Sequence, residues 1–119
     1  MPSSASQTSH LCLVSDEVIA NITPLLDSAF RPARAYLAVA PPYTQAAEYL
    51  ASVFKKLDVA CEHIMIDSAW DIERIRDQFM TFMETRQDGD IILNLSGGTR
   101  PMALAAHEVF LAYEQPVFH

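Results

Sequence analysis

The stretch DIILNLSGGTRPMALAA, residues 90–106, decides the fold of this chain. An apolar run comes first, two adjacent glycines follow, and an alanine-rich segment of helical character comes last. The whole chain has only three glycines, so a pair at one turn indicates a special requirement of the backbone there. This order is typical of a strand that passes into a helix through a tight turn in an α/β protein.

The same alternation of short apolar runs and amphipathic stretches extends in both directions from this turn. Apolar runs predict five strands, over residues 10–14, 33–40, 59–66, 90–96 and from 115 onward. Amphipathic spacing and capping residues predict four helices. The first begins at Pro24, with Asn21 or Thr23 as its cap, and the second spans residues 46–57. The third follows a cap at Asp67 or Ser68, and the fourth spans residues 100–113.

Strands that alternate with helices of this length predict a parallel sheet covered on both faces. The fold class that we expect is α/β, a Rossmann-like open parallel sheet with helices on both faces and strand order 3-2-1-4-5. In that order the ends of the first and fourth strands share one crevice at the carboxyl edge of the sheet. Ligands of open α/β sheets bind at such a crevice.

Composition limits the classes of protein and partner. The 119 residues suffice for one domain with a single core, and no apolar run approaches the roughly 20 residues of a membrane span. Cys12 and Cys61 form no CxxC pair, so we expect reduced core thiols in a cytoplasmic protein. A net charge of −7 argues against binding to duplex nucleic acid.

The two ends of the chain differ from its centre. Residues 1–9 are polar, and we interpret them as a loose N-terminal leader. Residues 10–119 form the predicted domain. The chain stops almost as its fifth strand begins, so we expect a domain truncated at its C-terminus from a longer protein.

The residues at the crevice suit a phosphate group. Thr99 can cap the last helix and Pro101 fits its first turn, while free amides and the helix dipole attract an anion. Arg100 adds a positive charge, and Ser15, Ser96 and Thr99 add hydroxyls. A tight strand-to-helix connection without any ligand would also explain the glycines and the cap. The chain contains neither GxGxxG nor GxxxxGK[ST], so dinucleotide and P-loop sites are poorly supported.

The segment NLSGGTRPMALAA, residues 94–106, resembles the signature of CARF domains, the CRISPR-associated Rossmann-fold sensors. It looks closest to those fused to a restriction-type nuclease, whose loop commonly reads N-x-[ST]-GGT-[KR]-x-M. The segment LVSDEVIANITPLL, residues 13–26, is similar to the first strand and following loop of that family, and the resemblance covers residues 11–119. Ser96 and Arg100 stand where threonine and lysine are commoner.

The resemblance implies a homodimer that binds a cyclic oligoadenylate, most often cyclic tetra-adenylate, across its two-fold axis. It implies ligand contacts from two loops, at Ser15, Asp16, Ser96, Gly97, Gly98, Thr99, Arg100 and Met102. It also implies an effector domain outside this chain, a nuclease in the subfamily named above. We expect no catalytic residue, no metal site and no cofactor in this domain, the cyclic nucleotide being its ligand.

Two other functions stay open. Some CARF proteins act as ring nucleases that cleave their own ligand without metal, and the hydroxyls and Arg100 suit that chemistry although no general base is evident. A flavodoxin-like domain that binds a mononucleotide fits the same fold. We expect this domain not to be catalytic alone and the parent protein to be a ligand-activated nuclease.

Overall fold

The computed structural model of this chain describes residues 8–23, 31–86 and 89–118. Its sheet is parallel with strand order β3-β2-β1-β4-β5, which confirms the predicted fold class and strand order. The strands are short, as is usual for a doubly wound sheet: β1 Ser9–Leu13, β2 Arg34–Val39, β3 Ala60–Met65, β4 Ile91–Asn94 and β5 Val117–Phe118.

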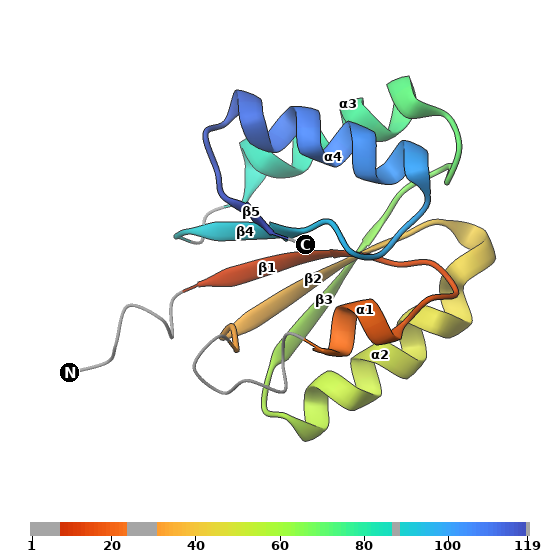
Figure 1. Cartoon of the computed structure of the whole chain (residues 1–119), viewed down its shortest axis with the longest axis vertical. Coiled ribbons are helices and arrows are strands. Elements are labelled where there is room, and N and C mark those ends of the chain that lie inside the picture. Colours follow the sequence, from red (N-terminus) through yellow and green to blue (C-terminus); the bar gives the residue numbers. More distant parts are fainter. Residues whose placement is uncertain (1–7, 24–30, 87–88, 119) are drawn as a thin grey trace.

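Helices cover both faces of the sheet, as Figure 1 shows. Two long helices lie on one face, and the short α1 and the long α2 lie on the other. The helical elements are α1 Ile19–Ile22, the 3₁₀ turn η3 Pro41–Tyr43, α2 Thr44–Lys56, α3 Ile72–Thr85 and α4 Arg100–Ala112. Within the described residues, no helix combines the length and the apolar character that a membrane crossing requires.

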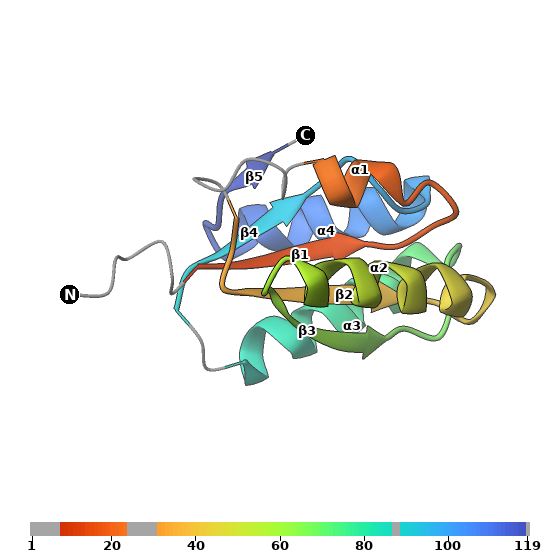
Figure 2. The same ribbon diagram turned by 90° about the horizontal axis from the view of Figure 1, so that it is seen from below.

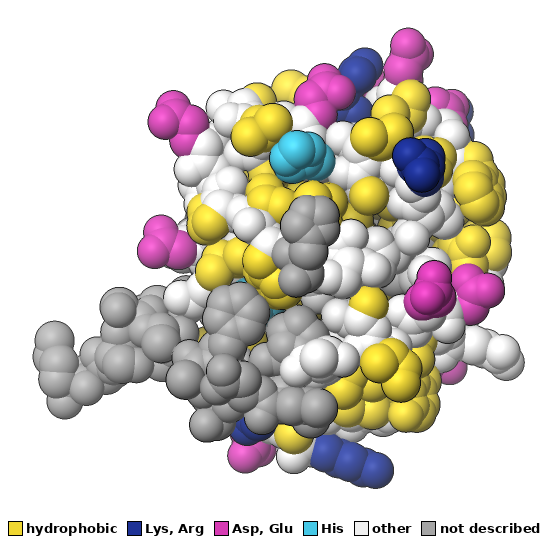
Figure 3. Space-filling model, in the orientation of Figure 1, with side chains coloured by type: hydrophobic (Ala, Val, Ile, Leu, Met, Phe, Trp, Pro, Cys, Tyr) yellow, Lys and Arg dark blue, Asp and Glu magenta, His cyan; other side chains and the backbone are white. Residues whose placement is uncertain are grey.

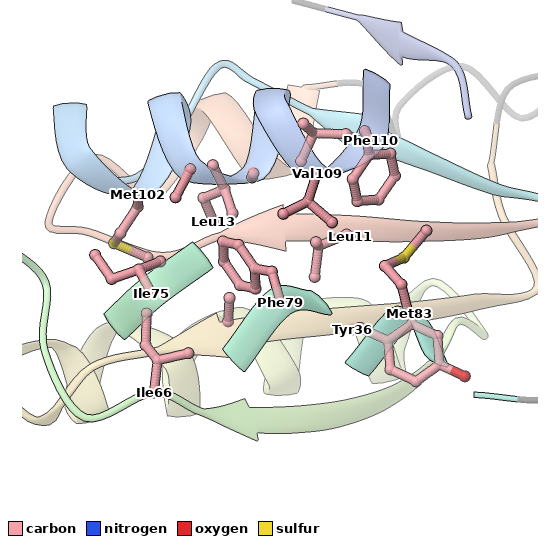
Figure 4. Close-up of a cluster of buried hydrophobic side chains, with 14 of the residues drawn as sticks. Leu11, Leu13, Tyr36, Ile66, Ile75, Phe79, Met83, Met102, Val109 and Phe110 are labelled. Atoms are coloured by element: carbon pink, nitrogen blue, oxygen red, sulfur yellow. The ribbon is translucent and has the colours of Figure 1, made fainter. Parts of the chain in front are cut away.

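Alternate residues of β1 supply two separate cores because successive side chains of a strand leave opposite faces. Leu11 and Leu13 are fully buried in the larger cluster, against α3 and α4. Cys12 and Val14 are buried in the second cluster, beneath α2. Figure 4 shows the larger core, in which Ile75, Phe79, Met102 and Val109 meet the strand side chains. Burial raises the pKa of the Cys12 thiol to about 12, which makes it unreactive.

Three expected boundaries need correction. β1 begins at Ser9, so this residue belongs to the domain, and residues 1–7 of the predicted leader lie outside the described residues. The first helix starts at Ile19, and Asn21 lies inside it and does not cap it. A helix from Pro24 would lie outside the described residues. Asp71 caps α3, because its carboxylate accepts the Arg74 amide at 3.2 Å.

The expected cap Ser68 organises the turn before that helix. Its hydroxyl oxygen accepts hydrogen bonds from the amides of Trp70 and Asp71, both at 3.0 Å. Figure 2 shows that the segments after β1, β2, β3 and β4 all leave the sheet at one edge. These segments can therefore build a candidate site together at the carboxyl ends of the strands.

The stability of the domain is expected to fall in mild acid through His10. This residue is buried on β1 against the Phe118 ring, and burial lowers its pKa from 6.5 to about 4. Between pH 6.5 and pH 4 the His10 imidazole is therefore protonated in the unfolded chain and neutral in the folded chain. The free energy of unfolding consequently falls as the pH drops through that window. We expect His10→Phe to abolish about 2 kcal/mol of the loss between pH 7 and pH 4.5.

Urea unfolding at both pH values, for the wild-type protein and the variant, measures this difference. His63→Phe is the control, because His63 is exposed on β3. An acid-induced loss of equal size in the wild-type protein and in His10→Phe would contradict the prediction.

Candidate ligand-binding site

Thr99 fixes the end of the loop between β4 and α4. Its hydroxyl oxygen accepts the Met102 amide at 3.3 Å, which confirms the predicted cap of α4, and Pro101 lies in the first turn as expected. The same hydroxyl donates to the carbonyl oxygen of Ala69 at 2.5 Å. The single hydroxyl hydrogen is thus used inside the protein, and Thr99 holds the loop to the turn before α3.

The two glycines let this loop lie directly against the end of β1. A Cβ atom on Gly97 would lie 2.5 Å from the Leu13 carbonyl oxygen and 2.9 Å from the Asn21 side-chain nitrogen. Gly98 has φ +83°, and a Cβ atom there would lie 2.6 Å from the Leu13 Cβ. The side of each glycine that a Cβ atom would occupy therefore faces β1, so both glycines serve close packing.

Two buried asparagines join the β4 loop to α1. The Asn94 amide group donates to the Ala20 carbonyl oxygen at 3.2 Å and to the Asn21 side-chain oxygen at 3.4 Å. Its own oxygen accepts the Ser96 amide at 2.8 Å, while Asn21 donates to the Leu13 carbonyl oxygen at 2.9 Å. Neither asparagine was a predicted site residue, because their meeting depends on tertiary structure.

We expect Asn94→Ala to lower the free energy of unfolding by about 2 kcal/mol, because the Ser96 amide and the buried Asn21 side-chain oxygen lose their partner. Urea unfolding measures the loss. Asn94→Asp is the matched variant, since a carboxylate still accepts the Ser96 amide but cannot donate to Ala20 or Asn21. A loss for Asn94→Ala below about 0.5 kcal/mol would show that the network is dispensable.

Three backbone amides of this loop are candidate donors to a ligand, at a buried residue (Gly97), a partly buried one (Gly98) and an exposed one (Arg100). The N–H groups of Gly97, Gly98 and Arg100 have no hydrogen-bond acceptor within the part of the chain that the structure describes. They surround the N-terminus of a 13-residue helix, whose dipole favours negative charge. The arrangement can bind a phosphate group.

A pocket of about 310 Å³ opens beside these amides. It is lined by the loop and by one face of α4: Leu95, Ser96, Gly97, Gly98, Thr99, Arg100, Ala103, Leu104 and His107. Arg100 is exposed, as is Ser96, so a cation and a hydroxyl are accessible there. Figure 3 shows this face of the molecule, with a histidine and hydrophobic side chains over α4. Leu104 and His107 were missed as candidates, although they follow Arg100 at helical spacing.

The other predicted loop lies after β1 and faces a different pocket. Ser15 is buried, and its hydroxyl oxygen accepts the Glu17 amide at 3.4 Å. Asp16 is exposed and lines a hollow of about 540 Å³ with residues of η3 and α2. The two predicted loops therefore share the carboxyl edge of the sheet but do not line one common pocket.

Met102, another predicted site residue, has a side chain with no exposed surface. Its side chain is fully buried in the larger core, and its sulfur accepts the Thr99 amide at 3.5 Å. A ligand in the pocket cannot reach this side chain while the core stays packed. Met102 instead anchors the start of α4 and thereby the loop.

Comparison with known families identifies this arrangement. The model of the Card1 CARF domain matches residues 9–119, which is nearly the whole chain. The chain belongs to the CARF family. The glycine pair, the capping threonine and Arg100 thus form the β4–α4 loop of a CARF domain. No curated protein sequence matches the chain significantly.

Solved structures share the fold of this CARF domain. Protein VC1899 from Vibrio cholerae is 25% identical, with a TM-score of 0.83 over 94% of this chain and 30% of its own. Can2 from Sulfobacillus thermosulfidooxidans, solved with cyclic tetra-adenylate, is 23% identical, with a TM-score of 0.71 over 92% of this chain and 31% of its own.

A third relative is described as a type III CRISPR defence DNA nuclease activated by cyclic oligoadenylate. It is 19% identical, with a TM-score of 0.61 over 85% of this chain and 16% of its own. This CARF domain therefore spans less than a third of the length of these three relatives.

Proposed function

We propose that this CARF domain binds a cyclic oligoadenylate, cyclic tetra-adenylate above all, and signals its presence in the cytoplasm to an effector during type III CRISPR defence. The observation that carries the proposal is the set of three acceptor-free amides, at Gly97, Gly98 and Arg100, beside an exposed guanidinium. Can2, which shares the fold, was solved with cyclic tetra-adenylate. In this domain the same amides would hold a phosphodiester of that ring.

Local contacts must supply the affinity. Each chain carries a formal charge of −7, so long-range electrostatics opposes an anionic ligand. Hydrogen bonds from amides that need no reorganisation, together with charge-assisted bonds from Arg100, act only at short range and overcome this repulsion. The β4–α4 loop is held rigidly by Thr99 and Asn94, so little entropy is lost when the phosphate binds.

A second copy of the chain completes the site in this proposal. The outer face of α4 next to the pocket carries two exposed leucines, Leu104 and Leu111, which are 51% and 61% accessible. A two-fold axis along this face would bury both leucines and bring two β4–α4 loops to one cyclic ligand. Ligand binding would then shift the packing of the two copies and so activate an effector, a nuclease by our expectation, elsewhere in a longer protein.

A ring nuclease is the second candidate, and one observation favours it. His107 lines the pocket, and histidine is the side chain most often used as a general base. The sequence alone offered no such base at the site. A base there could take the proton from a ribose 2′-hydroxyl that attacks the adjacent phosphate. The bond from phosphorus to the 5′-oxygen would break, the 5′-oxygen would take a proton from the protonated base or from water, and a 2′,3′-cyclic phosphate would remain.

Incubation with cyclic tetra-adenylate tests both candidates. At a hundredfold excess over the Kd, the sensor is expected to gain about 10 °C in Tm and to leave the ring intact in mass spectrometry. If the wild-type protein converts the ring to linear fragments and His107→Ala does not, the ring nuclease is established. Unchanged Tm with cyclic oligoadenylates, with stabilisation by a mononucleotide, would contradict both. Sedimentation with and without ligand reports the dimer.

A further inference from the structure

The outer edge of β3 is able to pair with a further strand. β3 ends the strand order, and Figure 2 shows it at the border of the sheet with no described strand beyond it. Its six residues pair with β2 in unbroken register, so no bulge twists the edge away. β3 contains neither lysine nor proline, two residues that commonly keep an edge strand from pairing. Its one carboxylate, Glu62, forms an ion pair with Arg34 of β2.

Alternate residues of β3 direct their backbone groups away from the sheet. The amides of Ala60 and Ile66 donate to carbonyl oxygens beside and on β2, at 3.2 Å and 2.9 Å, so the even-numbered residues face that strand. The N–H and C=O groups of Cys61, His63 and Met65 therefore point outward. No hydrogen bond outside the ladder joins these three residues to another described residue. The main chain of a further polypeptide has donors and acceptors at the spacing that pairs with all of them.

A hollow of about 340 Å³ lies between this edge and α3. It is lined by the end of β3 and by one face of the helix: Ile64, Met65, Gln78, Thr81, Phe82 and Thr85. The Gln78 side-chain oxygen already accepts the Asp67 amide at 3.0 Å. The hydroxyls of Thr81 and Thr85 donate to carbonyl oxygens of α3 itself, at 3.1 Å and 2.9 Å. Because these polar groups are bonded and Met65 is 56% exposed, the hollow favours apolar side chains.

The charge beside the hollow indicates which kind of strand fits. Asp77 is exposed on α3, one residue before Gln78, and its carboxylate makes no ion pair within the described ranges 8–23, 31–86 and 89–118. A lysine or arginine at the end of an added strand can pair with it. A second copy of the chain would instead bring another net charge of −7 to this edge, which opposes self-pairing.

We infer that the β3 edge and the hollow together, the β3 groove, bind an extended peptide segment of a partner protein. The segment has apolar residues at alternate positions and a basic residue at one end. Its main chain pairs with the outward groups of β3, and its apolar side chains enter the hollow beside Ile64 and Phe82. The β3 groove shares no lining residue with the pocket at the β4–α4 loop, so the inference is independent of the proposed function.

Isothermal titration of the 119-residue chain with the peptide acetyl-Lys-Val-Thr-Val-Thr-Val-Lys-amide, without any nucleotide, tests the inference. The wild-type protein should bind this peptide. Two N-methylated versions, one at the valine amides and one at the threonine amides, should differ, because only alternate amides of a strand face β3. One version should bind about tenfold more weakly or worse, and the other within about threefold of the parent peptide. Glutamate in place of both lysines should also weaken binding about tenfold.

Met65→Lys is the variant that blocks the β3 groove. Met65 is 56% exposed, so the substitution should preserve the fold, while the new charge repels the lysines of the peptide and weakens binding about tenfold. Met80→Lys is the matched control, because Met80 is exposed on α3 outside the hollow, and its affinity should stay within about threefold of the wild type.

Three results would overturn the inference. The first is failure of the wild-type protein to bind the peptide, and the second is equal binding of the two N-methylated versions or of Met65→Lys and the wild type. The third is a dimer in sedimentation that Met65→Lys dissociates, which would assign the edge to a second copy of the chain. Binding of cyclic tetra-adenylate is measured separately, so none of these results bears on the proposed function.

Discussion

Gly97→Ala is expected to lower the free energy of unfolding by about 3 kcal/mol. The added Cβ would lie 2.5 Å from the Leu13 carbonyl oxygen, which is backbone in the centre of the sheet and cannot rotate away. It would also lie 2.9 Å from the Asn21 nitrogen that bonds to the same oxygen. Either the β4–α4 loop moves away from β1 or the asparagine network breaks.

Urea unfolding of Gly97→Ala and of Ser96→Ala measures this effect, because Ser96 is the exposed neighbour in the same loop. Ser96→Ala should unfold within about 0.5 kcal/mol of the wild-type protein. A loss in Gly97→Ala as small as that of Ser96→Ala would contradict the close packing of the loop on β1. Gly98→Val is a poorer probe of ligand binding, because its Cβ would meet Leu13 at positive φ and disturb the fold as well.

Arg100→Ala is expected to weaken cyclic tetra-adenylate roughly 100-fold or more. A charge-assisted hydrogen bond contributes about 1.5–3 kcal/mol, and a ligand on the two-fold axis loses two such guanidiniums at once. Arg100 is exposed, and its side chain makes no ion pair with the described part of the chain, so its removal should not change Tm without ligand. Isothermal titration measures the loss.

Arg74→Ala is the matched control for the charge. Arg74 lies on α3, its side chain is 58% exposed, and it contributes nothing to the lining of the pocket. It changes the net charge by the same unit, so any equal weakening in both variants would reflect long-range electrostatics. Affinity of Arg100→Ala within threefold of the wild type would mean that Arg100 does not contact the ligand.

The layers could be predicted from the sequence because the period of apolar residues reports which faces are buried. The strand order was expected because it is usual for a Rossmann-like sheet, and the structure confirms it. The pair Gly97–Gly98 and the cap Thr99 are equally local signals, and the structure confirms the cap. Helix starts were less certain where several residues can cap. Ser68 and Asp71 both bond to amides near α3, and only the fold of the preceding turn decides which one begins the helix.

Only the backbone features of the candidate site, the loop and the start of the helix, could be predicted from the sequence. The reason for Gly97 lies in Leu13 and Asn21, more than 70 residues earlier, and no local pattern indicates such a contact. Met102 was assigned to the ligand through the family signature, yet its position on α4 places it in the core. Leu104 and His107 could have been found, because residues three, four and seven after Arg100 share its helical face.

The most direct test of the account is a titration of the ¹⁵N-labelled domain with cyclic tetra-adenylate, followed by amide chemical shifts. The amides of Gly97, Gly98 and Arg100 donate to no described acceptor. When they bond to a phosphate, their three proton signals should therefore move downfield together and saturate with the calorimetric Kd. If the ligand binds while these three signals stay in place, the phosphate is held elsewhere and the central claim is wrong.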